Sequence, residues 1–375
     1  MQSFDYTTLK AICHSLRQIL IPSRVEQIYQ WDTNTIALCL RSLKQKHWLK
    51  ISWHPQGARI CIGESPPRQK DTFTLSEQLR HLINGYALIG IEIVTDWERV
   101  IEFSFAQRPN ESPLYHLYVE IVGKYSNVIL TNSHQQIITV AKQVKAHQST
   151  MRTVETGQIY QFPPSLQGDT PKLSESREKW QDKISLIPGK IEQQLIKTYR
   201  GVSPIIAKLL LEKAQIDPNK NNQELTLIEW EKLYHNWQWW LSVIKDNQFY
   251  PYETEKGYSV LGTPQENKDI NKLLNNYYNK CLYKEKFDNL KQQLQQKVKN
   301  NLKKITIKKD KYELKIKESD NSEQYSKKAD LLMAYSHLWQ PGMKEIELKD
   351  FETEKIVKIK LSPDKNMIQN AQVLY

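Results

Sequence analysis

The sequence predicts an α+β protein in which a strand-rich N-terminal region is followed by helical segments and one long helix. Three observations predict this fold class. Short β-rich runs alternate with turns from Ile28 to about Tyr160, residues 175–245 have helical periodicity, and apolar residues recur at three- and four-residue steps from residue 271 to residue 319. A chain of 375 residues is also too long for one small core, so we expect several domains.

The N-terminal region is expected to form a mixed α/β domain over residues 1–172. Two of its segments have helical character, Tyr6 to Leu20 and Ser76 to Leu82, and Thr74 or Ser76 can cap the second. The predicted strands are rich in β-branched and aromatic residues. They are Thr35 to Arg41, Trp48 to Trp53, Leu88 to Val94, Val100 to Phe105, Leu114 to Ile121, Asn127 to Thr131 and Ile137 to Val140.

Proline residues mark the end of this domain. Pro163, Pro164 and Pro171 predict an extended exit near residue 170. In the following region, residues 173–250, the run from Tyr199 to Pro204 interrupts the helical pattern, and Pro204 suits the first turn of a helix that ends at Ala214. We therefore expect two short helices joined by a tight hairpin.

A long amphipathic helix is expected over residues 265–328, with the spacing of a coiled coil. Its apolar positions are Phe287, Leu290, Leu294, Val298, Leu302, Ile305 and Tyr312. Residues 329–375 are expected to form a small module that begins with a helix from Asp330 to Leu338 and continues with strands. No returning helix follows in this sequence, so the apolar seam should pair between chains or stay partly disordered.

The charge of the chain favours anionic partners. Lys and Arg number 53 against 42 Asp and Glu, which gives a formal charge of +11 and a pI near 9.2. From residue 291 to residue 309 the long helix has seven lysines and no acid, namely Lys291, Lys297, Lys299, Lys303, Lys304, Lys308 and Lys309. These lysines form either a solvated helix face or a surface that follows phosphates, and the absence of alternating signs favours the second.

Several classes of protein and site are not indicated. The four cysteines form no CxxC pair, which predicts free thiols in a reducing compartment and neither a disulfide framework nor a metal site. No run of eighteen apolar residues occurs, so we expect a soluble cytoplasmic protein with no membrane partner. No phosphate-binding glycine loop, HExxH motif or nucleophile elbow is present, so we expect no enzyme, catalytic residue or cofactor.

One segment carries a specific resemblance. Residues Glu120 to Asn127, hereafter the signature loop, read Glu-Ile-Val-Gly-Lys-Tyr-Ser-Asn. This run is similar to the Glu-Ile-Met-Gly-Lys-His-Ser-Asn signature of the NFACT family, from which Val122 and Tyr125 depart. The matches that agree in order include Ser3-Phe4-Asp5, Ile51 to Pro55, Leu79 to Leu82, Gly201 to Pro204 and Asn370 to Gln372. The resemblance covers nearly the whole chain.

The resemblance implies a fold and a function. The N-terminal domain would resemble the N-terminal fold of formamidopyrimidine-DNA glycosylases, followed by a helix-hairpin-helix module, part of a coiled-coil arm and a middle module. The protein would bind a large ribosomal subunit obstructed by peptidyl-tRNA and recruit tRNA, with alanyl-tRNA as the expected species, for template-free tailing of the stalled chain. The ribosome would form the peptide bonds, and the lysines of the long helix would bind ribosomal RNA.

The same resemblance assigns candidate tRNA-binding residues. The family has an Asp-Arg pair that is needed to recruit tRNA, and here the matching pair is Glu98-Arg99, with Asp96 as a rival for the role of the acid. A guanidinium can hold a phosphate or a base edge through two hydrogen bonds, and a carboxylate can orient it. The full set is Asp5, Glu98, Arg99, Glu120, Lys124, Tyr125, Ser126 and Asn127.

Other interpretations of these residues are open from the sequence. Without the resemblance, Glu98-Arg99 would be an ordinary solvated pair at a strand end. Two other functions are a fibronectin-binding surface adhesin, against which the absence of a secretion signal weighs, and a glycosylase-like binder of DNA. The chain begins Met1-Gln2-Ser3, without the N-terminal proline nucleophile of those glycosylases, and it has no zinc-finger cysteines.

Overall fold

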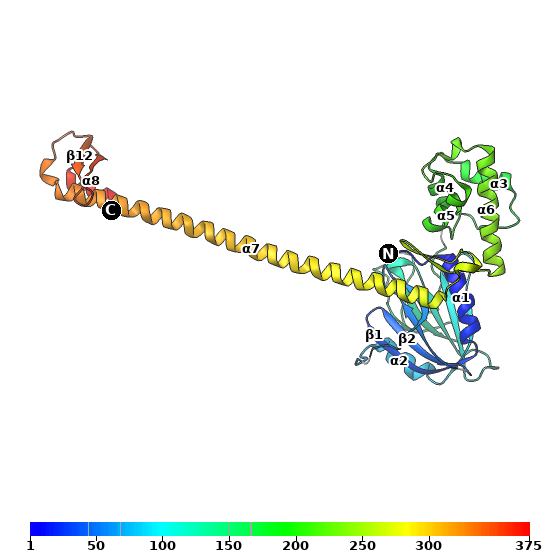
Figure 1. The fold of residues 1–375 in the computed structure, drawn as a ribbon. Coiled ribbons are helices and arrows are strands. Elements are labelled where there is room, and N and C mark those ends of the chain that lie inside the picture. The colour runs from blue at the N-terminus through cyan, green and yellow to red at the C-terminus, as the bar shows by residue number, and fades with distance from the viewer. Residues whose placement is uncertain (44, 68, 150, 166) are drawn as a thin grey trace. The chain divides into compact units, whose positions relative to one another are not determined.

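The computed structural model describes residues 1–43, 45–67, 69–149, 151–165 and 167–375. It forms two compact units, Met1–Lys284 and Glu285–Tyr375. The first unit contains a large antiparallel sheet with helices, and the second contains most of a long helix and a small hairpin module (Figure 1). The predicted α+β class is confirmed. The finer domain boundaries given above stay predictions.

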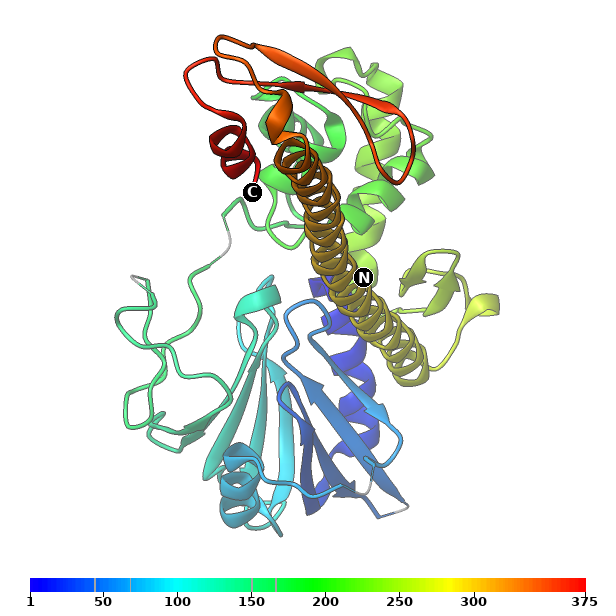
Figure 2. The same ribbon diagram turned by 90° about the vertical axis from the view of Figure 1, so that its left-hand side faces the viewer.

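The N-terminal sheet has nine antiparallel strands in the order β4-β3-β2-β1-β5-β6-β7-β8-β9. The junction of β1 with β5 has two residue pairs, Ser23 with Leu88 and Arg24 with Ala87, so two halves of the sheet diverge from a short seam (Figure 2). The strands are β1 Ser23–Asp32, β2 Thr35–Arg41, β3 Lys46–Ser52, β4 Arg59–Gly63, β5 Ala87–Ile93, β6 Val100–Ala106, β7 Tyr115–Glu120, β8 Asn127–Asn132 and β9 Ile137–Val140.

Two helices close this sheet. Helix α1, Tyr6–Leu20, contacts β4 and β5, and its apolar residues at helical spacing, Leu9, Ile12, Leu16 and Leu20, are fully buried. Helix α2, Thr74–Ile83, contacts β1 and β9. The expected cap of α2 by Thr74 or Ser76 is wrong. Asp71 supplies the local hydrogen bonds instead, because its Oδ1 accepts from the backbone N–H of Phe73 and from the Ser76 hydroxyl.

The sequence does not predict strands β1 and β4. In β1 the pairing register shifts between Val25 and Gln27, so the alternation of buried and exposed residues is interrupted. Strand β4 is only five residues long. The other seven strands lie where the sequence predicts them, with ends that differ by one or two residues.

A helical module follows the sheet in the first unit. Its helices are α3 Arg177–Ser185, α4 Ile191–Thr198, α5 Pro204–Ala214 and α6 Leu227–Asp246. As predicted, Pro204 lies in the first turn of a helix that ends at Ala214, and the Ser203 hydroxyl caps this helix. We call residues 199–204, between α4 and α5, the hairpin. A small β-ribbon, β10 Tyr252–Thr254 and β11 Gly257–Ser259, leads to the long helix.

The long helix α7 spans Ile270–Ala334, and its first turns cover the free edge of β4. Asparagines at every fourth position face the sheet there. Asn271 Oδ1 accepts from the backbone N–H of Ile62 at 2.9 Å, Asn275 Oδ1 accepts from Lys50 Nζ at 3.2 Å, and Asn279 Oδ1 accepts from Arg59 Nη2 at 3.1 Å. Lys50 and Arg59 are both buried, so the amide oxygens each accept one hydrogen bond from a buried cation.

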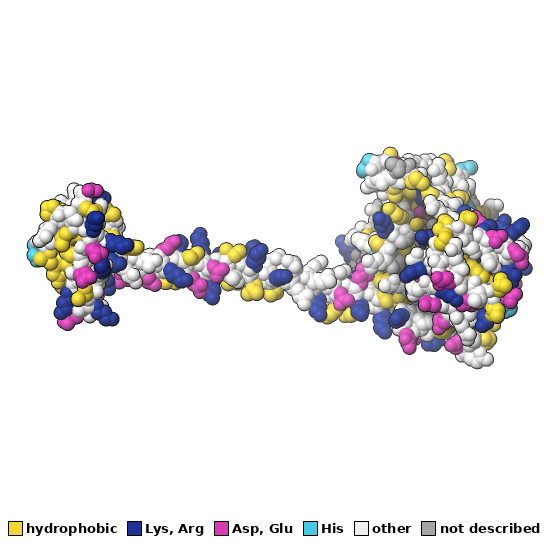
Figure 3. All heavy atoms as spheres, turned by 90° about the horizontal axis from the view of Figure 1, so that it is seen from above, with side chains coloured by type: hydrophobic (Ala, Val, Ile, Leu, Met, Phe, Trp, Pro, Cys, Tyr) yellow, Lys and Arg dark blue, Asp and Glu magenta, His cyan; other side chains and the backbone are white. Residues whose placement is uncertain are grey.

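The second unit has its own small core. Helix α7 continues to Ala334, so the separate helix predicted from Asp330 to Leu338 is wrong, and only a short 3-10 turn, Ser336–Leu338, follows it. Strands β12 Glu345–Lys349 and β13 Ile356–Lys360 pair, and α8, Met367–Leu374, packs with them against the end of α7. The predicted apolar seam from Phe287 to Tyr312 is exposed in this unit, between lysines (Figure 3).

Candidate nucleic-acid interface

The signature loop joins β7 to β8 through a 3-10 turn, η1 Gly123–Tyr125. Gly123 has φ +55°, a left-handed conformation that glycine adopts without a steric cost. The buried Ser126 hydroxyl accepts from the backbone N–H of Val122 at 2.9 Å and donates to the Gly123 carbonyl at 2.7 Å. Ser126 therefore holds the turn closed from inside.

Asn127 fixes the second end of the loop. Its side-chain amide donates to the Lys142 carbonyl at 2.8 Å and accepts from the Lys142 backbone N–H at 2.9 Å. Asn127 itself is buried, and both hydrogen bonds to Lys142 are partly buried. The residue ties the signature loop to the segment that follows β9.

Glu120, at the first end of the loop, belongs to a buried ionic cluster. Its Oε1 accepts from Arg152 Nη2 at 2.6 Å and from the Tyr160 hydroxyl at 2.8 Å. Burial raises the pKa of Glu120, and the charge and hydrogen bond of Arg152 oppose that shift. The carboxylate is thus engaged by the protein's own residues.

Arg99 lies on the opposite side of the loop, in a cavity of about 440 Å³ that the hairpin lines together with residues at the ends of β6 and β7. Its Nη1 donates to the Phe4 carbonyl at 3.2 Å. Burial lowers the pKa of Arg99, and the nearby carboxylates of Asp5 and Glu98 raise it. The cavity also contains Gly123 of the signature loop and Ser203 of the hairpin. It therefore brings together three separate segments of the chain around one guanidinium.

The carboxylates of Asp5 and Glu98 each contact residues other than Arg99. The buried Asp5 carboxylate caps α1 by accepting from the Thr8 N–H at 2.8 Å, and its second oxygen accepts from the Ser203 hydroxyl at 2.6 Å. Glu98, with a side chain 13% exposed, forms an ion pair with Arg200 of the hairpin at 3.7 Å. Each acid therefore links the sheet domain to the helical module.

A second and larger cavity, about 680 Å³, lies on the other face of the signature loop. Glu120, Tyr125, Asn127, Met151, Arg152 and Pro163 are among the residues that line it. The Tyr125 side chain is 69% exposed, and Lys124 Nζ lies 4.9 Å from the centre of its ring. An exposed aromatic ring next to a cation can stack on a base and attract a phosphate.

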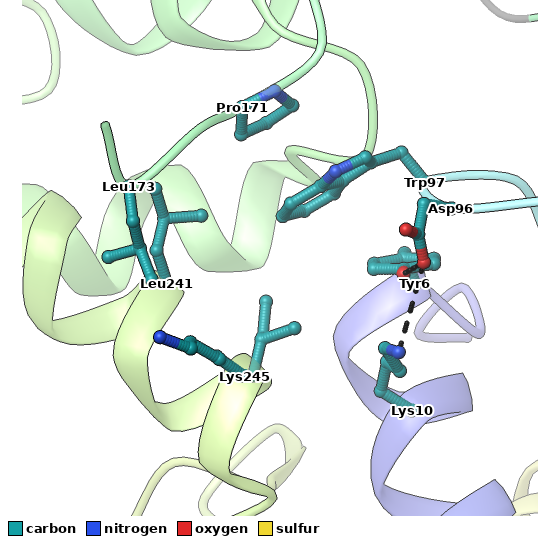
Figure 4. Close-up of a pocket in the computed structure, with 9 residues that line it drawn as sticks. Tyr6, Lys10, Asp96, Trp97, Pro171, Leu173, Leu241 and Lys245 are labelled. Carbon is teal, nitrogen blue, oxygen red and sulfur yellow. Dashed lines mark hydrogen bonds and ion pairs between the residues drawn. The ribbon is translucent and has the colours of Figure 1, made fainter. Parts of the chain in front are cut away.

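A third cavity, about 320 Å³, adjoins the Arg99 cavity through Tyr6 and Trp97, which line both (Figure 4). Asp96 points into it, accepts from the Tyr6 hydroxyl at 3.3 Å and lies 3.9 Å from Lys10 Nζ. The Asp96 side chain is 80% exposed. Asp96, the rival acid in the sequence, is therefore open to solvent whereas Glu98 is not.

The structure separates the eight predicted tRNA-binding residues by exposure. Lys124 and Tyr125 are exposed, and Arg99 is half-buried in its cavity. The remaining five have internal contacts described above, namely Asp5, Glu98, Glu120, Ser126 and Asn127. Their roles toward RNA stay predictions. For these five the geometry favours a role in shaping the site over direct contact.

Sequence reasoning missed the internal partners Arg152, Tyr160 and Arg200. The acid Glu120 lies between Val119 and Ile121 in a strand, and such a position signals a buried carboxylate that needs a partner. The sequence does not say which cation supplies it, because Arg152 lies beyond two further strands.

The predicted ribosomal RNA-binding lysines form part of the exposed length of α7. Lys291, Lys297, Lys299, Lys303, Lys304, Lys308 and Lys309 are all exposed. Lys309 pairs with Glu313 at 3.4 Å, and this is the one ion pair within 4 Å that these seven lysines form in the part of the chain that the structure describes. The lysines are therefore available to an external anion.

The remaining predicted features concern cysteines, metals and membranes. All four cysteines are free thiols, as predicted, and Cys13, Cys39 and Cys61 are also buried. Within residues 1–43, 45–67, 69–149, 151–165 and 167–375, no group of three or more His, Cys, Asp or Glu residues is placed to hold a metal ion. Over the same ranges, no helix combines the length and the apolar character needed to span a bilayer.

Comparison with known proteins decides the family. Residues 5–375 match the NFACT N-terminal and middle domains. The chain belongs to this family. It is 25% identical to the Rqc2 homolog RqcH of Bacillus subtilis over 100% of this chain and 66% of that protein, and 28% identical to RqcH of Streptococcus suis over 99% and 65%. The chain thus spans slightly less than two thirds of the length of these NFACT relatives.

Solved structures of similar proteins agree on the fold. The N-terminal part of the fibronectin/fibrinogen-binding protein of Streptococcus suis matches 74% of this chain and 100% of that structure, with a TM-score of 0.58 and 26% identity. The fibrinogen-binding protein of Staphylococcus aureus matches 74% and 99%, also with a TM-score of 0.58, at 23% identity. The NFACT chain therefore shares most of its fold with both.

Proposed function

We propose that this NFACT chain binds tRNA as part of a ribosome-associated quality-control factor. The observation that carries the proposal is the Arg99 cavity, where a guanidinium bonded to a backbone carbonyl faces a space lined by the signature loop and the hairpin. The hydrogen bond to Phe4 uses one of the five N–H donors of Arg99, so a phosphate or base edge that enters the cavity beside the Asp5 and Glu98 carboxylates can accept from others. The similarity to RqcH proteins supports the same function.

In the finer form of this proposal, the factor binds a large ribosomal subunit that peptidyl-tRNA obstructs. It recruits tRNA, with alanyl-tRNA as the expected species, and the ribosome adds residues to the stalled chain without a template. The protein itself supplies binding and positioning and no catalytic group. Lys124 and Tyr125 contact the same tRNA from the exposed side of the signature loop, and the closeness of the cation to the ring supports this role.

Replacement of Arg99 tests the proposal directly. R99A should remove tRNA from the purified protein, because the guanidinium at the centre of the cavity is lost, whereas R108A should retain it. Arg108 is a matched control because its side chain is 84% exposed outside all three cavities. Sequencing of the co-purified RNA identifies the species. Equal tRNA recovery from R99A, R108A and unaltered protein would remove Arg99 from the site.

The lysines of α7 are proposed to bind ribosomal RNA. K303Q/K304Q/K308Q should weaken binding to large ribosomal subunits and lower the slope of log affinity against log salt by about 2, at about 0.7 for each phosphate that is no longer bound. K172Q/K179Q/K256Q removes the same charge at exposed positions outside α7 and should leave that slope unchanged. The same slope for both triple variants would mean that α7 does not lie on RNA.

We propose two further partners for this chain. The exposed seam of α7 permits self-association through an unpaired coiled coil, which remains a prediction. Binding of fibronectin or fibrinogen is a second candidate function, because both solved relatives named above are described by such binding. Binding of fibronectin that R99A leaves unchanged, in protein that carries no tRNA, would favour that candidate.

A further inference from the structure

Three residues of the hairpin contact three different residues of the sheet domain. Ser203 donates to Asp5 at 2.6 Å, and Arg200 pairs with Glu98 at 3.7 Å. Gly201 lies against the indole of Trp97, so closely that a Cβ at Gly201 would be 2.6 Å from Cε3 of the ring. The hairpin is therefore seated on the sheet domain by contacts that come from separate segments.

The turn that carries Trp97 and Glu98 has an unusual backbone. Trp97 has φ +68°, which is uncommon for a residue with a bulky side chain. Such a conformation persists where the surroundings hold it. Here the indole packs against the rings of Tyr6 and Trp240, whose centres lie 4.7 Å and 5.5 Å from its own, and against the backbone of Gly201. This packing directs the next residue, Glu98, toward the hairpin.

Arg200 is held on more than one side. Its Nε donates to the Gly168 carbonyl at 3.0 Å, and its backbone N–H donates to the Asp169 carbonyl at 3.0 Å. Nη1 of the same guanidinium meets Glu98. Since Arg200 is already fixed by these carbonyls, the ion pair with Glu98 fixes the distance between the hairpin and the strand end that carries Arg99.

The two acids on either side of Trp97 differ in what they face. Asp96 is 80% exposed in the cavity of Figure 4, whereas Glu98 is 13% exposed and contacts Arg200. Asp96 is therefore the more accessible of the two carboxylates to an external ligand. The extra methylene of Glu98, relative to aspartate, lengthens its reach toward the hairpin.

We propose that Glu98 is a positioning residue for the RNA site, which holds the hairpin through Arg200 and thereby sets the width of the Arg99 cavity. Glu98 does not contact RNA. This role rests on the proposed function, because it concerns the same cavity. It also distinguishes Glu98 from Arg99, although the two are adjacent in the sequence.

A double-mutant cycle tests this role. E98Q and R200Q should each weaken tRNA binding by about 3- to 10-fold, and E98Q/R200Q should be no weaker than the weaker single variant, because both remove the same ion pair. The charge swap E98R/R200E should recover part of the loss. Two independent RNA contacts would instead give losses that multiply, and the swap would be the weakest variant.

D96N is the matched control for charge. Loss of a negative charge near RNA strengthens binding if the charge only repels phosphate, so D96N should bind tRNA at least as tightly as the unaltered protein, in contrast to E98Q. Amide hydrogen exchange without RNA should rise in residues 199–204 of E98Q and not of D96N. Unchanged exchange there, or additive losses in protein that binds tRNA, would overturn the role of Glu98 alone. Absence of tRNA binding by the unaltered protein would overturn the proposed function and this role with it.

Discussion

Two arginines on opposite sides of the signature loop differ in the groups that accept their hydrogen bonds. Arg152 donates to the buried Glu120 carboxylate at 2.6 Å, whereas Arg99 donates to the backbone carbonyl of Phe4 at 3.2 Å. Arg152 is bound to its carboxylate by a hydrogen bond, whereas the nearby carboxylates of Asp5 and Glu98 act on Arg99 through their charge. The contrast teaches that a carboxylate in a family motif need not be the group that meets the ligand, because its oxygens can serve the fold.

The largest expected effect tests this contrast by removing each arginine. R152M should lower the free energy of unfolding by about 3–5 kcal/mol, because it leaves the Glu120 charge buried and unpaired. R99M should cost only about 1 kcal/mol, the value of one hydrogen bond. Urea unfolding of both variants measures the difference. E120Q/R152M should recover much of the loss, and equal costs for R152M and R99M would show that the two sites are not different in kind.

A smaller effect concerns the carboxylate of Asp5 and its bond to the hairpin. S203A removes both the cap of α5 and the bond to Asp5 and should cost about 2 kcal/mol. S176A removes the cap of α3 and a local bond to Glu178, with no bond to a distant segment, and should cost about 1 kcal/mol. Thermal or urea unfolding compares them. If the two serines cost the same, the Asp5 bond adds nothing to stability.

The smallest effect contrasts the pH dependence of two carboxylates. Hydrogen bonds from Lys220 and Thr226 lower the pKa of Glu229, at the start of α6, to about 2. Its ionised form therefore stabilises the fold above about pH 4.5, and this contribution is lost as the pH falls toward 2. Because Glu229 is near the surface, we expect less than about 1 kcal/mol.

Glu120 should show the opposite sign. Burial raises the pKa of Glu120, so the ionised carboxylate lowers the stability of the folded state. This unfavourable contribution becomes smaller as the pH falls and Glu120 takes up a proton. Urea midpoints at about pH 6 and about pH 3 measure both effects. From about pH 6 to about pH 3 the stability of the unaltered protein relative to E229Q should fall, and its stability relative to E120Q should rise. A shift of the same sign for both variants would contradict these environments.

The sequence predicts most of the fold because its patterns are local. Alternation and turn residues locate seven strands, and apolar residues at helical spacing locate α1 and α7. The pattern does not predict strand β1, because a register shift interrupts the alternation of its buried and exposed residues. The pattern does not predict where α7 ends. Ala329, Leu331 and Leu332 are buried against the small module, and these tertiary contacts extend the helix to Ala334.

The candidate site is less predictable than the fold. The family motif locates the signature loop and the Glu98-Arg99 pair, but exposure within them depends on contacts across long sequence separations. Glu120 is 32 residues from Arg152, and Asp5 is 198 residues from Ser203. No local pattern encodes such pairs, so the sequence cannot separate the exposed residues of the candidate site from those that hold it in place.

The asparagines at the base of α7 have a consequence for how the helix is anchored. The amide oxygens of Asn275 and Asn279 hold Lys50 and Arg59, and an amide neither gains nor loses a proton in ordinary buffers. Mild acid that would release a cation from a carboxylate leaves these bonds intact. The hydrogen bonds that join the first turns of the helix to the sheet should therefore persist equally in acidified and in neutral solution.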